Sequence, residues 1–196
     1  MAADRWLIVG LGNPGSVYSH NRHNVGYWCI NRLARLHGIP LKARRLATIG
    51  EGSIRGTPVL LAKPRTYMNR SGQAVAALLR TFRIDRSRIL VVCDDLDLPA
   101  GTVRLRPGGG PGGQKGLASI IAATGSQGFP RLRIGIGRPA VNGEPTWDPD
   151  AVAVYVLSDP TPQEAEALQA AVAQAAEAVE TLLSEGLEPA MNRYNR

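Results

Sequence analysis

Short apolar runs bounded by turn residues recur along the chain and predict β-strands. These runs cover residues 6–9, 59–62, 89–93, 103–105 and 132–136. Helical periodicity falls between several of them, over residues 25–36, 73–82 and 117–123, and Gly38 ends the first helix. Strands that alternate with helices favour an α/β sheet covered by helices on both faces.

The strongest helix signal lies near the end of the chain. Thr161-Pro162-Gln163-Glu164 is a capping box with proline at the first helical position, and Gly186 ends the pattern. Between them one apolar stripe recurs at steps of three and four, at Leu168, Val172, Ala175, Val179 and Leu182. We interpret this helix as a packing element. Because no composition shift or repeat marks a boundary, we expect one domain over residues 1–196.

Composition adds a charge argument to this pattern. Hydrophobic residues make up 44% and charged residues 20% of the 196 residues, which is typical of a globular protein. Lys and Arg outnumber Asp and Glu by 23 to 16, and this net charge of +7 favours a polyanionic partner such as nucleic acid. The alternative is that the excess only keeps the protein soluble. Aromatic residues are only 5%, so RNA binding should rest on phosphate contacts more than on base stacking.

The cysteines and the N-terminal residues indicate the cellular compartment in which the protein works. Cys29 and Cys93 are far apart and outside any C-x-x-C pattern, so they predict neither a disulfide scaffold nor a zinc site. The first residues lack a signal-peptide pattern, and no run reaches the roughly 20 apolar residues of a membrane span. We therefore expect a cytoplasmic protein with no membrane segment.

A glycine-rich loop follows the first predicted strand. Residues 10–15, G-L-G-N-P-G, have the G-x-G-x-x-G spacing of dinucleotide-binding proteins. Pro14 interrupts this loop, and residues 31–50 contain no Asp or Glu to hold a ribose. We therefore disfavour the nucleotide-cofactor reading, which a titration with NAD would test.

Polar side chains cluster on the loop over residues 18–26 and at the ends of later strands, where α/β proteins place their sites. His20 and His23 have H-x-x-H spacing, but no Cys or carboxylate lies nearby in the sequence, which disfavours a metal. Asn69 either points its amide outward or caps the following helix. Asp94 either orients an imidazole or serves only turn chemistry.

A second glycine-rich segment, residues 108–113, lies between Arg106 and Lys115. It is not a phosphate-binding P-loop, because Gly116 stands where the metal-binding Ser or Thr should follow the lysine. A flexible backbone flanked by cations suits close contact with RNA. A plain surface loop is the alternative.

Taken together and in order, these segments resemble the bacterial-type peptidyl-tRNA hydrolase family. The motifs are G-L-G-N-P-G, R-H-N-x-G, T-Y-M-N-x-S-G, D-x-L-D-L-P, G-G-G and R-L-R-I-G-I-G, between residues 6 and 138, with a weaker likeness in the closing helix. The resemblance implies a single α/β domain with a twisted mixed sheet flanked by helices. It also implies a monomer that hydrolyses peptidyl-tRNA in translation and ribosome rescue, without metal or organic cofactor.

The resemblance assigns roles to particular residues. It implies that His23 is a general base on the hydrolytic water and that Asp94 accepts a hydrogen bond from it. The residues that it implies for substrate positioning and discrimination are Asn13, Asn69 and Lys115. Those that it implies for tRNA binding are Tyr18, Tyr67, Arg106 and Arg133.

The chain departs from the family pattern at three positions. Lys115 stands where the family usually has Asn, Gln114 where His is common, and Cys93 where His often precedes the Asp. Lysine keeps a hydrogen-bond donor but loses the acceptor, so the substrate contact at position 115 should change. Because His23 and Asp94 are both present, we expect an active enzyme. The alternative is a non-catalytic RNA-binding protein on the same fold.

Overall fold

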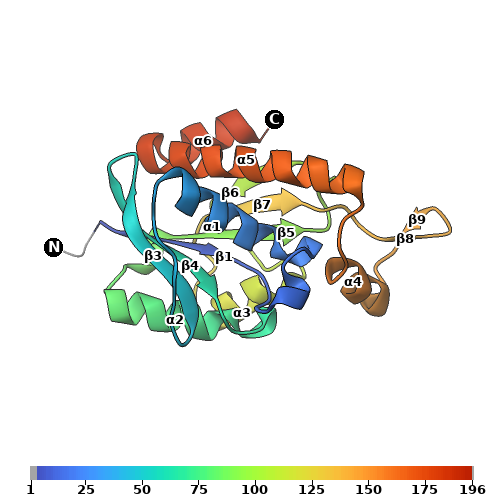
Figure 1. Ribbon diagram of the computed structural model, residues 1–196, viewed down its shortest axis with the longest axis horizontal. Helices are drawn as coiled ribbons and strands as arrows, with labels where there is room; N and C mark the ends of the chain where they lie inside the picture. The colour runs from blue at the N-terminus through green and yellow to red at the C-terminus, as the bar shows by residue number, and fades with distance from the viewer. Residues whose placement is uncertain (1–3, 196) are drawn as a thin grey trace.

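A seven-stranded sheet lies between two layers of helices in the computed structural model of the protein, which describes residues 4–195 (Figure 1). The strands are β1 (Trp6–Gly10), β2 (Lys42–Ala43), β3 (Ala47–Ile54), β4 (Thr57–Pro64), β5 (Ile89–Asp95), β6 (Val103–Arg106) and β7 (Arg131–Gly135). Their order across the sheet is β2-β3-β4-β1-β5-β7-β6. The four central strands are parallel, whereas β2, β3 and β6 each run antiparallel to a neighbour, so the sheet is mixed.

The helices divide between the two faces of the sheet. In chain order they are α1 (Val25–Leu36), α2 (Ser71–Phe82), α3 (Lys115–Thr124), α4 (Pro149–Val156), α5 (Pro162–Glu185) and α6 (Leu187–Tyr194). One hydrophobic core packs α1, α5 and α6 on one face, and a second packs α2 and α3 on the other (Figure 1). The central strands are therefore buried on both sides, which explains their continuous apolar runs.

Single 3₁₀ turns and a small hairpin complete the described chain. The turns are η1 (Ser16–Tyr18), η2 (Arg22–Asn24), η3 (Met68–Arg70) and η4 (Arg86–Arg88). The hairpin of β8 (Ala140–Val141) and β9 (Glu144–Pro145) projects with α4 at one end of the molecule (Figure 1). The first glycine-rich loop leads into η1, not into an α-helix as a dinucleotide-binding loop would.

The predicted fold class is confirmed, and the five expected strands and four expected helices are all present. The first helix and the capped closing helix have the predicted bounds, and Thr161 and Glu164 form both bonds of the capping box. Strand β3 was not predicted, because Gly50 and Gly52 break its apolar pattern. A Cβ on either glycine would lie within 3 Å of Ile39, so both must stay small for that side chain to pack.

The last described residues close an edge of the sheet. Asn195 follows α6, and its side chain accepts a hydrogen bond from the Leu105 amide at 2.7 Å and donates one to the Leu105 carbonyl at 2.9 Å. Leu105 lies on β6, the edge strand beside β7. The amide side chain therefore takes the place of a neighbouring strand and satisfies backbone groups at an open edge.

Helix α1 begins in very close contact with the strands beneath it. A Cβ on Gly26 would lie 2.5 Å from the Leu11 nitrogen, 2.6 Å from the Leu11 oxygen and 2.5 Å from the Val92 oxygen. These atoms belong to backbone, which cannot move aside as a flexible side chain would. Glycine at position 26 thus sets how closely the loop before α1, with His23, approaches the end of β5.

We predict that Gly26→Ala lowers the free energy of unfolding by about 1–3 kcal/mol or more, because overpacking forces backbone to shift. The matched control is Gly110→Ala, since a Cβ there has no atom within 4 Å and the residue has no positive φ. Urea unfolding of both variants checks the prediction. Equal stability of the two variants would contradict the close packing of α1.

Candidate active site

The principal cavity opens at the carboxyl ends of the parallel strands. Its volume is about 910 Å³, and its walls come from the ends of β5 and β7, the glycine-rich segment before α3, and α4. Helix α4 and the β8–β9 hairpin lie at this end of the sheet (Figure 1). Among the predicted site residues, it is lined by Asn13, His23, Tyr67, Asn69, Asp94, Arg106, Lys115 and Arg133.

His23 and Asp94 form a buried hydrogen-bonded pair in this cavity. The distance from His23 Nδ1 to Asp94 Oδ2 is 2.7 Å, and the two side chains are 12% and 3% exposed. A hydrogen on Nδ1 donated to the carboxylate leaves the lone pair on Nε2, which has no hydrogen-bond partner among the described residues. The structure thus brings together two residues that are 71 positions apart, in the geometry of a general base.

Gln114 engages the other oxygen of the same carboxylate, a contact that the sequence analysis did not anticipate. Its Nε2 donates to Asp94 Oδ1 at 2.9 Å and lies 3.3 Å from the Met68 sulfur. Its Oε1 accepts a hydrogen bond from the Leu117 amide at 2.9 Å, which caps α3 and fixes which way the amide faces. Both oxygens of Asp94 are therefore bonded.

The charges around His23 act on its pKa in opposite directions. Burial lowers the pKa of the imidazole, but the charge of Asp94 and the hydrogen bond to it outweigh burial and raise the pKa above the ordinary value of 6.5. The Lys115 ammonium lowers it in turn. The unusual lysine therefore counteracts part of the effect of Asp94 and favours the neutral imidazole that a base requires.

Asn13 is held rigidly between two loops. Its Oδ1 accepts a hydrogen bond from the Met68 amide at 2.8 Å, and its backbone exchanges two hydrogen bonds with the Asn24 side chain at 2.9 and 3.0 Å. The Asn13 Nδ2 group has no protein partner among residues 4–195. A fixed amide donor is thus available at the wall of the cavity.

The structure distinguishes the two predictions for Asn69, an outward-pointing amide or a helix cap. It is exposed, lines the cavity, and caps neither η3 nor α2 by a side-chain hydrogen bond. The helix-cap reading is therefore wrong. Tyr67 lies beside it and is 59% exposed, so both side chains are accessible to a ligand.

The cations at the cavity differ in how they are held. Arg106 and Lys115 are exposed, and neither forms an ion pair in the described part of the chain. Arg133 is half-buried and paired with Asp95. A phosphate at Arg133 would therefore share the guanidinium with a carboxylate, which the sequence did not reveal.

Two buried arginines support the site from behind. Arg131 is 3% exposed, and its guanidinium donates to the Gly109 and Gly110 carbonyls at 2.7 and 2.9 Å, which holds the glycine-rich segment in place. Arg22, next to His23, donates to Glu164 at 2.6 Å and lies over the Tyr155 ring, 4.2 Å from its centroid. Both arginines belong to sequence motifs, Arg131 to R-L-R and Arg22 to R-H-N, but nothing in the sequence indicated that they are buried and not on the surface.

Tyr18 and His20 lie outside the principal cavity. Tyr18 is half-buried at the end of η1, and His20 is exposed in the turn that follows. The structure therefore does not bring Tyr18 to the His23–Asp94 pair. Within residues 4–195, no group of three or more His, Cys, Asp or Glu is placed to hold a metal ion.

The mixed sheet and the imidazole–carboxylate pair in its cavity are typical of an α/β enzyme. The chain belongs to the peptidyl-tRNA hydrolase family, whose sequence profile matches residues 7–196. A peptidyl-tRNA hydrolase of Chloroflexus aggregans is 51% identical over 192 residues, which cover 97% of this chain and 98% of the relative. The corresponding protein of Desulforudis audaxviator is 47% identical over 96% of this chain and 92% of its own length.

A solved structure agrees with this assignment. The crystal structure of peptidyl-tRNA hydrolase from Acinetobacter baumannii has a TM-score of 0.88 to this chain and is 40% identical in sequence. The likeness covers 97% of this chain and 94% of the other. None of the helices in the described residues is long and apolar enough to span a membrane.

We predict that Lys115→Met raises the pKa of His23, because it removes a nearby positive charge, and that Asp94→Asn lowers it, because it removes the stabilising negative charge. Titration of the imidazole by NMR measures both shifts, and the exposed His20 is the internal control. Shifts of the opposite sign, or none, would contradict the electrostatic arrangement described here.

Proposed function

We propose that this chain hydrolyses the ester bond of peptidyl-tRNA to free tRNA and peptide, with His23 as the general base and Asp94 as its orienting partner. One observation carries the proposal. In a chain of this family, the His23 Nδ1 atom lies 2.7 Å from a buried carboxylate, in a cavity of about 910 Å³. The ring nitrogen left without a partner is the basic one.

The residues support a two-step ester hydrolysis. His23 Nε2 takes a proton from water as the oxygen attacks the ester carbonyl carbon. The tetrahedral intermediate then collapses and expels the ribose oxygen, which receives the proton from His23. A positioned general base typically contributes roughly 10²- to 10⁴-fold to the rate. Asp94 stabilises the imidazolium that forms between the two steps.

Two donors suit the negative charge that develops on the carbonyl oxygen. Asn69 presents an exposed amide, and Lys115 presents an ammonium near the imidazole. One such donor is typically worth roughly 10²- to 10³-fold in turnover. Lys115 would stabilise an oxyanion more strongly than a neutral amide does, although it cannot accept a hydrogen bond from the peptide.

Asn13 is our candidate for discrimination between substrates. Its Oδ1 is occupied by the Met68 amide, so the group left for a ligand is Nδ2, which is a donor. A carbonyl of the first peptide bond beyond the ester accepts such a hydrogen bond, whereas the charged amine of an unblocked aminoacyl-tRNA cannot. The fixed orientation of Asn13 therefore supports selection for blocked substrates.

The tRNA end would contact the cations and tyrosines around the cavity. Arg106 is exposed and unpaired among the described residues, which suits a phosphate, and Arg133 contributes a second guanidinium beside Asp95. Tyr67 offers an exposed ring to a base. Tyr18 does not line the cavity, so we propose that it contacts the tRNA only at the outer surface of the protein.

We also infer that the protein acts in the cytoplasm as a monomer and rescues tRNA that is stranded during translation. All the residues proposed for the reaction come from one chain, so a second copy is not required to complete the site. Peptidyl-tRNA is made by ribosomes, which places its hydrolysis in their compartment.

The test is hydrolysis of N-acetyl-aminoacyl-tRNA and of unblocked aminoacyl-tRNA by the purified protein, with a chelator present. We expect rapid release from the blocked substrate alone, and a loss of at least 10²-fold in turnover for His23→Ala with tRNA binding retained. The binding readout is the fluorescence of a dye attached to the tRNA. Full activity of His23→Ala would remove the general-base role.

The same assay addresses the alternative, a non-catalytic RNA-binding protein on this fold. That function predicts tRNA binding without release of either amino acid. The intact pair of His23 and Asp94 argues against it, because a buried imidazole–carboxylate pair has little use in phosphate binding.

We predict that Gln114→Leu lowers kcat by roughly ten- to a hundredfold, because a hydrogen bond to a charged group is worth about 1.5–3 kcal/mol. The variant should also shift the acid limb of the pH–rate profile, since Asp94 would lose a donor that disperses its charge. Gln114→His, which keeps a donor, should restore activity. An unchanged pH–rate profile in Gln114→Leu would mean that Gln114 only caps α3 and does not act on Asp94.

A further inference from the structure

A second cavity of about 390 Å³ lies on the other side of Asn13 from the His23–Asp94 pair. Asn13 is the residue that lines both cavities. The other walls of the second cavity come from the first glycine-rich loop, α1, and the paired strands β3 and β4. We call it the Lys63 pocket, and its remaining lining residues are Pro14, Gly15, Ser16, Ser19, Asn24, Tyr27, Trp28, Asn31, Thr48, Lys63 and Arg65.

The pocket holds positive charge without a carboxylate. None of its described lining residues is Asp or Glu, while Lys63 and Arg65 both contribute to the wall. Lys63 is half-buried. Among the described residues its ammonium donates only to the neutral side-chain oxygen Oδ1 of Asn31, at 2.7 Å, and it lies 5.5 Å from the Tyr27 ring centroid. Burial lowers the pKa of Lys63. A desolvated cation without an ion pair is costly, and a bound anion would offset that cost.

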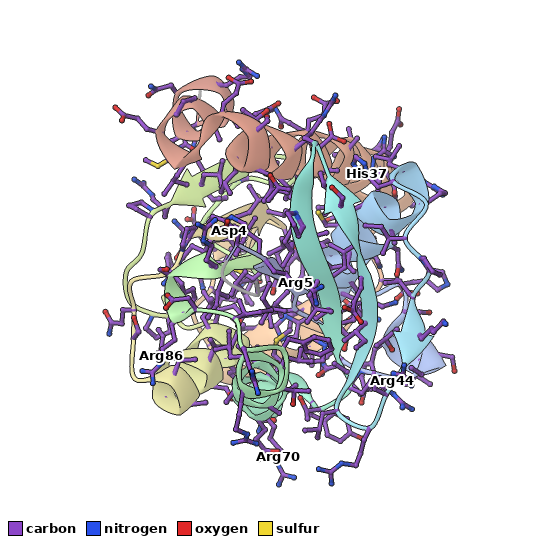
Figure 2. All side chains as sticks on the ribbon, turned by 90° about the vertical axis from the view of Figure 1, so that its left-hand side faces the viewer. Asp4, Arg5, His37, Arg44, Arg70 and Arg86 are labelled. Carbon is purple, nitrogen blue, oxygen red and sulfur yellow. The ribbon has the colours of Figure 1, made fainter. Side chains whose placement is uncertain are left out.

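The rim of the pocket is basic as well. The Arg65 guanidinium donates to the Arg44 carbonyl at 2.8 Å, which fixes the turn after β2 beside the pocket. Arg44 and Arg45 are exposed and form no ion pair within the described chain (Figure 2 labels Arg44 at the edge of the sheet). Within residues 4–195, no carboxylate is paired with these guanidinium groups.

The charge of the whole chain is divided in the same way. Residues 5–84 contain 13 Lys and Arg but one acidic residue, Glu51, whereas residues 85–196 contain 14 Asp and Glu against 10 Lys and Arg. The elements that build the Lys63 pocket all belong to the basic half. A polyanion that enters the principal cavity is therefore also attracted toward this pocket.

The remaining groups in the pocket suit a nucleotide. Trp28 is half-buried and anchored by its indole N–H, which donates to the Ser19 carbonyl at 2.8 Å. A fixed aromatic ring can stack on a base of any identity. Asn31 and Thr48 add amide and hydroxyl groups for a ribose or a base edge. A volume of about 390 Å³ is in the range of small-ligand sites.

We propose that the Lys63 pocket binds a nucleotide of the substrate's 3′ strand just upstream of the nucleoside that carries the ester, with its phosphate on Lys63 and Arg65 and its base against Trp28. The inference rests on the proposed function. Asn13 lines both cavities, so they are neighbours, and a strand that places its ester at His23 can place an adjacent nucleotide in the pocket. Binding energy from this nucleotide then fixes the register of the ester.

The experiment compares three substrates with the same N-acetyl-aminoacyl ester: full tRNA, the trinucleotide CCA, and adenosine, which carries no phosphate. We expect Lys63→Gln to lower kcat/KM for tRNA and CCA by about tenfold or more, since a hydrogen bond to a charged group is worth that factor. The adenosine ester should be cleaved at the wild-type rate. Lys63→Arg, which keeps the charge, should restore most of the loss.

Arg80→Gln is the matched control, because Arg80 is an exposed cation on α2 outside both cavities. The pocket assignment is overturned if Lys63→Gln behaves like Arg80→Gln on all three substrates. It is equally overturned if Lys63→Gln impairs the adenosine ester as much as CCA, since that indicates general damage to the site. If the wild-type protein cleaves none of them, the proposed function fails, and calorimetric binding of deacylated CCA to the wild-type and Lys63→Gln proteins still decides the pocket.

Discussion

Asp94 is the penultimate residue of the central strand β5, and its two carboxylate oxygens bond side chains that come from opposite faces of the sheet. Oδ2 accepts from His23, which precedes α1 on one face, and Oδ1 accepts from Gln114, which caps α3 on the other. A buried carboxylate is costly unless its lone pairs are satisfied, so the charge and the two helix starts depend on each other. The close contact at Gly26 brings the first helix near enough for this bond to form.

The site differs from the usual family pattern at neighbouring positions whose effects are connected. Gln114 bonds Asp94 directly, as an imidazole donor at that position would, and its amide also caps the helix that begins with Lys115. Lys115 brings a positive charge close to His23 and lowers the pKa that Asp94 raises. The lysine therefore keeps the imidazole neutral down to a lower pH than Asp94 alone would.

The acidic residues of α5 and the cations near the cavities differ in how they are paired. Two acidic residues of α5 are bonded to side chains of the same chain. Glu164 bonds Arg22, and Glu180 bonds His37 and Arg55. In the described part of the chain, the cations that line the cavities lack such partners, apart from Arg133 and Arg138, which are paired with Asp95 and Asp97. Phosphate groups would thus meet guanidinium and ammonium groups that internal carboxylates do not neutralise, which favours fast association as well as affinity.

The sequence by itself determined the fold class, the main helices and strands, the family, and the candidates His23 and Asp94, because apolar periodicity, caps and ordered motifs are local signals. Only the tertiary structure decided which candidates meet. It joined His23 to Asp94 across 71 positions, placed Asn69 free in the cavity and left Tyr18 outside it. Strand β3 could not be predicted from the sequence, because glycines required for close packing interrupt its apolar pattern. The contacts of Gln114 and Arg131 could not be predicted either, because hydrogen bonds between residues far apart in the chain leave no periodic pattern.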